Sequence, residues 1–235
     1  MIFKGWQKTS LVEYPGRVST VLFCGGCNLR CPFCYNTELV LDPARIPDLR
    51  SEDVLSYLEA ARPLREAVIV TGGEPTLQEE LPVFLSAVKK LGYLAGLETN
   101  GTRSGMLARL LDEDLLDFVA MDVKAPLEPD CYARAAGVED GRIVGEVERS
   151  VRMLLSGSVE YELRTTVVPG IHGSQDIPLL GRQLAGAKRY VIQQFVPDKT
   201  LDAELQTTEA FSRETLERWR DAVGALVGSC EVRNV

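Results

Sequence analysis

Four of the six cysteines lie within eleven residues, in the segment Cys24-Gly-Gly-Cys27-Asn-Leu-Arg-Cys31-Pro-Phe-Cys34. The last three, Cys27, Cys31 and Cys34, have the spacing C-x3-C-x2-C. Thiolates are the usual protein ligands of iron–sulfur clusters, and three of them on one short loop can hold three irons of a [4Fe-4S] cluster. The fourth iron would then stay open to another ligand. Such a cluster could do chemistry on that ligand as well as carry electrons.

The cysteine segment also allows two other metal sites. All four thiolates could bind zinc, although structural zinc sites usually divide their ligands into two pairs separated by a longer loop. A fully protein-ligated cluster could instead serve electron transfer, with Cys24, Cys131 or Cys230 as its fourth ligand. Free cysteine is commonly a small, buried, apolar side chain. Because Cys24 ends an apolar run, it is predicted to be a buried thiol rather than a ligand.

Polar motifs follow the next predicted strands along the chain. Thr71-Gly-Gly-Glu-Pro75 follows the apolar run 67–70, Glu98-Thr-Asn-Gly101 follows the run 94–97, and Asp122 and Lys124 lie at the end of the run 118–123. The carboxyl ends of parallel strands build the site in α/β proteins, so these motifs are predicted to converge. Glycines at such a place allow a ligand to approach the backbone closely. Each motif alone is also compatible with a simple turn or, for Asp122 and Lys124, with a structural ion pair.

Two single residues have chemistry of their own. Arg164 is the only charge in the run 163–168, and a buried guanidinium needs a partner, for which a ligand carboxylate and Glu98 are both candidates. His172 is the only histidine and lies close to Gly170 and Gly173, so it is predicted to be a surface loop residue. A single histidine also disfavours His-rich metal sites and His-centred catalytic triads.

Between these motifs the chain alternates between predicted strands and helices. Strands are predicted at 18–23, 67–70, 94–97, 118–123, 161–168 and 190–195, with a last short strand near 230–235. Helices are predicted at 51–61, at 77–91 under a Thr76–Glu79 capping box or from Pro82, and at 106–116, 143–155, 177–184 and 212–227. Such alternation implies parallel strands with helices outside, as an incomplete barrel or an open twisted sheet. With no evident linker, residues 1–235 are predicted to form one domain.

Composition and charge disfavour several classes of protein. The hydrophobic content of 45% is too high for a disordered chain. A formal net charge of −8 without a basic run disfavours nucleic-acid binding. The N-terminal segment does not have the pattern of a secretory signal, and no apolar stretch approaches the roughly 20 residues that span a bilayer. Clustered cysteines without a sign of export indicate a reducing, cytoplasmic environment.

Taken together, these motifs resemble the radical S-adenosylmethionine (SAM) superfamily. The segment 27–34 matches its C-x3-C-x2-C motif, residues 71–75 its Gly-Gly-Glu-Pro motif, and the six βα units its α/β fold, a partial (β/α)6 barrel with parallel strands. GWQKTSLVEYPG at 5–16, ETNG at 98–101, MDVKAP at 121–126 and VVPG at 167–170 resemble glycyl-radical-enzyme activating proteins, most closely the activators of anaerobic ribonucleoside-triphosphate reductase. Departures from that pattern are Cys24, Tyr35 in place of a common His, and Gln193 and Gln194 on the sixth strand.

The resemblance implies a cofactor site. Cys27, Cys31 and Cys34 would hold a [4Fe-4S] cluster whose open iron binds the amine and carboxylate of SAM. Further SAM contacts would come from Phe33, Tyr35, Gly72, Gly73, Glu74, Pro75, Glu98, Thr99, Asn100, Asp122, Lys124 and Arg164. An electron from a flavodoxin or ferredoxin would cleave SAM to methionine and a 5′-deoxyadenosyl radical. That radical would remove a hydrogen atom from a glycine of a partner glycyl radical enzyme, so no side chain needs to act as a general acid or base.

Two alternatives stay open at the level of sequence. The protein could be a radical SAM enzyme that acts on a small molecule, because the substrate depends on loops whose sequence does not identify it. It could also be a non-catalytic iron–sulfur or zinc module. Residues 36–50 contain no cysteine, so only one cluster is expected.

Overall fold

The computed structural model describes residues 1–61 and 64–234, and these residues pack into two compact units. The first unit comprises Met1–Asn28, Glu38–Thr99 and Gly105–Ala120, and the second comprises Leu29–Thr37, Asn100–Ser104 and Met121–Val235. That the chain forms one domain stays a prediction. None of the described helices is long and apolar enough to cross a membrane.

The first unit is built on a sheet with the strand order β2-β3-β5-β6-β7. Its strands are β2 (Gly5–Ser10), β3 (Ser19–Cys24), β5 (Ala67–Gly72), β6 (Leu94–Thr99) and the start of β7 (Phe118–Asp122). Strand β3 pairs with β5, and β5 with β6, in parallel, with Val21 opposite Ile69 and Ile69 opposite Gly96. The parallel arrangement brings the C-terminal ends of β3, β5 and β6, with the motifs that follow them, to one edge of this sheet.

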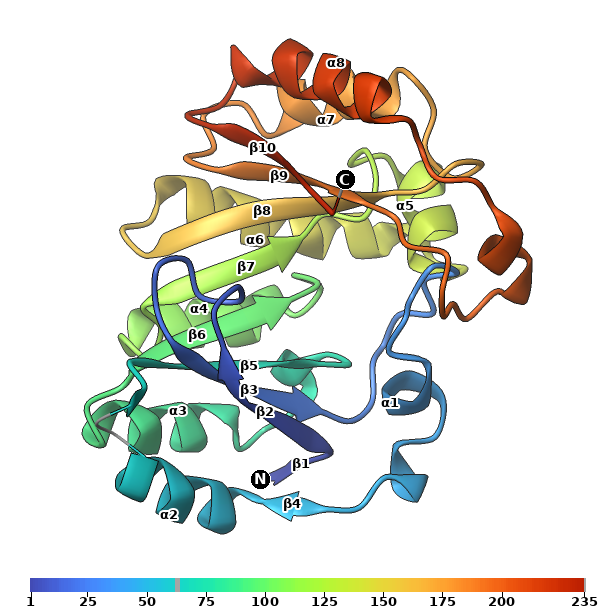
Figure 1. Ribbon diagram of the computed structural model, residues 1–235. Helices are drawn as coiled ribbons and strands as arrows, with labels where there is room; N and C mark the ends of the chain where they lie inside the picture. Colours follow the sequence, from blue (N-terminus) through green and yellow to red (C-terminus); the bar gives the residue numbers. More distant parts are fainter. Residues whose placement is uncertain (62–63, 235) are drawn as a thin grey trace. The chain divides into compact units, whose positions relative to one another are not determined.

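Helices and short elements complete the first unit. They are α1 (Thr37–Leu41), α2 (Ser51–Ala61), α3 (Leu81–Lys90), α4 (Ser104–Asp112), the 3-10 turns η1 (Pro43–Arg45) and η3 (Pro75–Leu77), and the antiparallel pair β1 (Ile2–Phe3) and β4 (Leu49–Arg50). Helix α3 packs against α2 and β6 (Figure 1). It begins at Leu81 because Pro82 is tolerated only in the first turn, and it is followed by Gly92 with φ +80°. The alternative start at Pro82 is thus confirmed within one residue.

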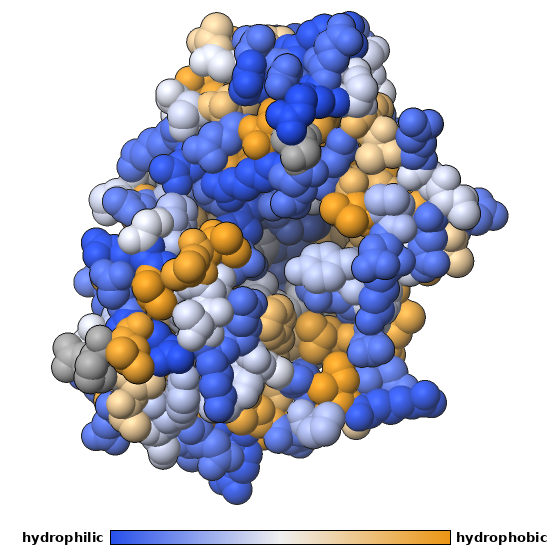
Figure 2. Space-filling view, viewed as in Figure 1, coloured by the Kyte–Doolittle hydropathy of each residue, from blue (hydrophilic) through white to orange (hydrophobic). Residues whose placement is uncertain are grey.

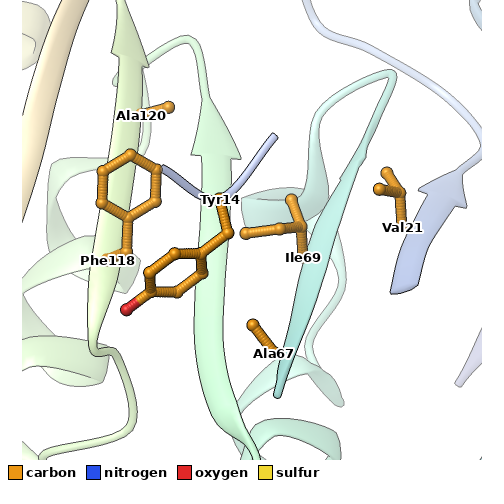
Figure 3. Packing of buried hydrophobic residues seen from close by; sticks show 6 residues of the cluster. All are labelled: Tyr14, Val21, Ala67, Ile69, Phe118 and Ala120. Atoms are coloured by element: carbon orange, nitrogen blue, oxygen red, sulfur yellow. The ribbon is translucent and has the colours of Figure 1, made fainter. Parts of the chain in front are cut away.

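An apolar cluster packs on the sheet of the first unit (Figure 3). It consists of Tyr14, Val21, Ala67, Ile69, Phe118 and Ala120. The ring centroids of Tyr14 and Phe118 are 5.0 Å apart. The β2–β3 connection therefore covers the beginnings of β5 and β7. Leu11 and Val12 in the same connection are exposed, and apolar surface is visible over this connection in Figure 2.

The second unit contains a sheet with the strand order β7-β8-β9-β10. Its further elements are β8 (Glu160–Val167), β9 (Tyr190–Gln194), β10 (Cys230–Arg233), α5 (Pro129–Ala136), α6 (Val144–Ser156), α7 (Asp176–Gln183), α8 (Arg213–Gly224), η4 (Gly141–Ile143) and η5 (Ala203–Thr207). Strand β9 pairs in parallel with β8 and with β10. Helices α7 and α8 pack together, and α8 contacts β9 and β10 (Figure 1).

The predicted alternation of strands and helices is confirmed as a mostly parallel α/β fold, and no closed barrel is found among the described strands. Five of the described strands and α-helices were not predicted: β1, β2, β4, α1 and α5. Strand β2 lacked a signal because its middle residues are polar and exposed. The Thr76–Glu79 capping box is wrong, because Glu74 accepts the Thr76 N–H and that turn ends at Leu77. Val235, in the predicted last strand, lies outside the described residues.

Candidate active site

The glycine pair after β5 packs directly against the end of β3. Gly72 has φ +118°, and a Cβ there would lie 2.4 Å from the backbone N and O of Cys24. A Cβ on Gly73 would lie 1.9 Å from the carbonyl oxygen of Gly26. The Gly73 N–H donates to the Cys24 carbonyl at 2.9 Å, and the Glu74 N–H to the Gly26 carbonyl at 2.8 Å. Gly72 and Gly73 therefore make room for the backbone of the cysteine loop. From sequence alone, the expected reason for these glycines was the close approach of a ligand.

Glu74 is fully buried and joins the ends of β5 and β6. Its carboxylate accepts hydrogen bonds from the Thr76 N–H at 3.0 Å, the Thr76 hydroxyl at 2.5 Å and the Thr99 hydroxyl at 2.7 Å. Nearby, the Thr71 hydroxyl donates to Glu98 at 2.7 Å. A buried carboxylate needs such donors to offset its desolvation. Four of the predicted site residues, Glu74, Pro75, Glu98 and Thr99, thus come together at the ends of two adjacent strands.

Cys24 is the last residue of β3 and is completely buried. Burial raises the pKa of its thiol strongly, and the negative charge of Glu74 raises it further. The side chain is therefore a neutral thiol at physiological pH. The predicted buried strand-end position is confirmed. Cys27, in the same unit, is half-buried.

Cys31 and Cys34 lie on a segment of the second unit that is fixed by its backbone. The Arg30 N–H donates to the Ala136 carbonyl and the Asp202 N–H to the Pro32 carbonyl, both at 2.9 Å. Gly137 follows α5 and has φ +63°. A Cβ on this residue would lie 2.0 Å from the Arg30 carbonyl oxygen. The Cys34 N–H donates to the Cys31 carbonyl at 3.0 Å. Cys31 is buried and Cys34 half-buried, so the two thiols belong to a well-held turn.

Asp122 and Lys124 form an ion pair, one of the alternatives that the sequence left open, with 2.7 Å between carboxylate and ammonium. Burial alone would lower the pKa of Lys124, but the charges of Asp122 and Cys31 outweigh it and the pKa is raised. The ammonium therefore stays charged at physiological pH. Burial raises the pKa of the Cys34 thiol, while an Asn36 backbone hydrogen bond and the Lys124 charge act in the opposite direction. Lys124 is thus electrostatically coupled to both Cys31 and Cys34.

The structure corrects the prediction for His172, which is buried rather than on the surface. Its Nδ1 accepts the Val168 N–H at 3.0 Å, and its Nε2 lies 2.8 Å from the Lys124 carbonyl oxygen. The ring of Phe33, between Cys31 and Cys34, lies edge-on at 6.5 Å between centroids. Desolvation is the main cause that lowers the pKa of the imidazole. No local pattern indicated this burial, because a histidine near two glycines is usually exposed.

Arg164 is buried and pairs with Glu162, with 2.5 Å between Nε and Oε1. Glu162 has a fully buried side chain that also accepts two hydrogen bonds from Arg233, at 2.7 and 2.9 Å. Sequence reasoning missed Glu162 as a partner of Arg164. Its position two residues earlier on the same strand, hence on the same face, was the available signal.

The remaining residues that the sequence singled out differ in their burial and in their hydrogen bonds. Asn100 is buried, and its Oδ1 accepts the Thr102 N–H at 3.0 Å and hydroxyl at 2.6 Å. Phe33 is buried, whereas Tyr35 is 67% exposed. The Gln194 amide donates to the Phe211 carbonyl at 2.5 Å, and its Oε1 is buried without a partner among the described residues.

The donor set of the cysteine segment fits an iron–sulfur cluster. Three thiols at 27, 31 and 34 are soft ligands of the kind that iron–sulfur clusters take. Among the residues that the structure describes, no three His, Cys, Asp or Glu side chains are gathered as a site for a metal ion. The support for these ligands is therefore their chemistry and spacing.

A family model described as the radical SAM superfamily matches residues 21–177. The chain belongs to the radical SAM superfamily. A Methanocaldococcus jannaschii protein, named provisionally as a glycyl-radical enzyme activating enzyme, is 30% identical over 208 residues, covering 87% of this chain and 84% of that protein. The pyruvate formate-lyase-activating enzyme of Clostridium pasteurianum is 31% identical over 226 residues, covering 88% of this chain and 90% of that enzyme.

Solved structures agree at the level of the fold. Streptococcus suis SuiB bound to SAM has a TM-score of 0.67 at 14% identity and covers 91% of this chain, which spans 52% of the SuiB chain. Radical SAM enzymes use a [4Fe-4S] cluster and SAM, and these are the cofactors of this family member. The resemblance to activating enzymes that the motifs indicated is confirmed.

Proposed function

We propose that this radical SAM enzyme installs a glycyl radical on a partner enzyme. The observation that carries the proposal is the extent of its likeness to two proteins named as activating enzymes, at 30% and 31% identity over 87% and 88% of the chain. A likeness of this extent includes the loops that follow the strands, where specificity is usually determined.

In this proposal each site residue has a task. Cys27, Cys31 and Cys34 hold the cluster, and the backbone of residues 72–75 meets the amino group of SAM. The Phe33–Tyr35 backbone would contact the adenine. Glu98, Thr99, Asn100, Asp122, Lys124 and Arg164 serve the carboxylate and ribose or a nearby cation. When bound to these residues, the cluster would supply the electron for reductive cleavage of SAM, and the resulting radical chemistry would be directed at the target glycine.

The protein itself positions the cofactor and shields it from solvent. Lys124 keeps its positive charge because Asp122 pairs with it, so it is available to an anionic group of the cofactor. The hydrogen bond from the Thr99 hydroxyl to the Glu74 carboxylate fixes the loop after β5. No side chain is required as a general acid or base, because the hydrogen atom moves to the carbon radical.

We propose anaerobic ribonucleoside-triphosphate reductase as the partner, and a flavodoxin or ferredoxin as the electron donor, in the cytoplasm. Support for this partner comes from the motifs at 5–16, 98–101, 121–126 and 167–170, and from the cysteine-free residues 36–50. A segment without cysteine leaves no ligands for the additional clusters that other activating enzymes carry in an insertion at this place.

The test is anaerobic reconstitution with iron and sulfide, followed by incubation with SAM, a reductant and the candidate reductase. Electron paramagnetic resonance should show a glycyl radical on the reductase and none on a variant whose target glycine is alanine. Release of 5′-deoxyadenosine without a glycyl radical on any candidate partner would favour a small-molecule substrate instead. Iron or zinc binding without any 5′-deoxyadenosine would favour a non-catalytic module.

A further inference from the structure

His172 connects two loops of the second unit through both of its ring nitrogens. Nδ1 accepts the Val168 N–H, which closes the turn after β8, so Nδ1 carries no proton. Nε2 must then hold the proton, and it donates to the Lys124 carbonyl at 2.8 Å. The imidazole thereby ties the loop after β8 to the loop after β7.

The backbone N–H and the ammonium of Lys124 also have partners. Its N–H donates to the buried Tyr132 hydroxyl at 3.3 Å, and its ammonium pairs with Asp122 at 2.7 Å. With its carbonyl on His172, each polar group of Lys124 has a partner within this unit. A lysine whose backbone and side chain are both fixed presents its charge in one place.

The imidazole also touches the cysteine segment. Its ring and that of Phe33 are 6.5 Å apart between centroids, at an angle of 61°. Phe33 is buried and lies between two of the proposed cluster ligands. One side chain thus contacts both Lys124 and the segment 31–34.

We propose that His172 is a positioning residue for SAM binding, acting through its Nε2–H hydrogen bond to the Lys124 carbonyl. This proposal rests on the proposed function, in which Lys124 serves an anionic or polar group of SAM. Loss of the Nε2 donor releases the Lys124 backbone and lets its ammonium move. Loss of the Nδ1 acceptor affects the 168–172 turn alone.

Two amide variants separate the roles of the ring nitrogens. In His172→Gln the side-chain NH2 reaches the position of Nε2 and can donate to Lys124. In His172→Asn the amide oxygen reaches only the position of Nδ1 and can accept from Val168. His172→Phe keeps the packing on Phe33 but removes both hydrogen bonds. Tyr161→Phe, which deletes a buried hydroxyl that accepts the Lys188 N–H at 3.0 Å, is the control for loss of a buried hydrogen bond elsewhere in the unit.

The first measurement uses the protein without cofactors. In protein enriched with ¹⁵N-lysine, a slowly exchanging ammonium signal that disappears in Lys124→Arg identifies the Lys124–Asp122 pair. We expect His172→Gln and Tyr161→Phe to keep this signal and His172→Asn and His172→Phe to lose it. The nitrogen spectrum of the single histidine should show a protonated Nε2 and an unprotonated Nδ1.

The second measurement uses the reconstituted enzyme, with 5′-deoxyadenosine formation followed against SAM concentration. Removing a partner of this kind typically costs about 10–100-fold, so we expect His172→Asn and His172→Phe to raise the KM for SAM at least about tenfold. His172→Gln should stay within about twofold of wild type, since it keeps the donor. The iron content per chain should be unchanged in all variants.

A purely structural role would lower the melting temperature of His172→Gln and His172→Asn alike and leave both the lysine signal and the KM unchanged. That result, or an opposite order of the two amide variants, would overturn the proposal. If the wild-type protein forms no 5′-deoxyadenosine, the proposed function fails instead. The lysine signal in the cofactor-free protein would still decide whether His172 holds Lys124.

Discussion

At the scale of single residues, the cysteines differ in their expected roles. Cys31 is a proposed cluster ligand, whereas Cys24 is a buried, neutral thiol. Cys31 belongs to the C-x3-C-x2-C set, and its replacement removes one of three proposed cluster ligands. We expect Cys31→Ala to reduce iron uptake after anaerobic reconstitution to background and to abolish 5′-deoxyadenosine formation. Iron analysis and chromatography of the reaction products measure the two effects. Full activity of this variant without a cluster would contradict the cluster assignment.

Cys24→Ser is the matched control for that substitution. Its thiol is buried at the end of β3 and kept neutral by desolvation and by Glu74, so the protein should assemble its cluster without it. A buried hydroxyl in place of the thiol should cost about 1–3 kcal/mol of unfolding free energy if it finds no partner. Loss of iron from Cys24→Ser would show that the ligands had been assigned wrongly.

How far sequence predicts single residues depends on whether the cause is local. The buried position of Cys24 and the Asp122–Lys124 pair were predictable, because each depends on residues close by in the sequence. The buried position of His172 was not predictable, since one of its two hydrogen-bond partners, Lys124, is 48 residues away in the sequence. Local sequence carries little information about a partner at that separation.

At the scale of elements, the glycine pair after β5 fixes where the cysteine loop begins. A Cβ on Gly73 would lie 1.9 Å from the Gly26 carbonyl, so Gly73→Ala must push the 24–27 segment away. Such overpacking typically costs about 1–3 kcal/mol. We expect a lower urea midpoint and poorer iron uptake, because the displaced loop contains Cys27. Gly145→Ala in helix α6, where nothing lies within 4 Å, should instead stabilise by about 0.5–1 kcal/mol. Equal midpoints for the two variants would contradict this account of the glycine pair.

The elements that sequence predicted well are those that bury one continuous apolar run or stripe. Strands β5, β7 and β9 and helix α2 are of this kind, and their predicted bounds agree with the structure within two residues. Helix α5 was missed because it is short and begins at Pro129 with a charged first turn. Such elements owe their stability to tertiary contacts more than to their own pattern.

At the scale of the whole molecule, the prediction of one domain can be tested with the two tryptophans. Trp6 lies in the first unit, where its ring packs on Tyr57 at 4.8 Å, and Trp219 lies in the second, where it packs on Phe211 at 4.8 Å. Each therefore reports the unfolding of its own unit. In Trp219→Phe the fluorescence follows the first unit, and in Trp6→Phe it follows the second.

If the chain is a single cooperative domain, each variant should unfold in urea with its fluorescence midpoint equal to its own circular-dichroism midpoint. Coincident probes are the standard sign of two-state unfolding. The comparison is made within one variant, so any stability lost by a Trp→Phe change cancels. Separate midpoints in either variant would show that the two compact units unfold independently. Since a ligand stabilises the native state of the part that binds it, cofactor binding should then raise the midpoint of each unit that contributes binding residues.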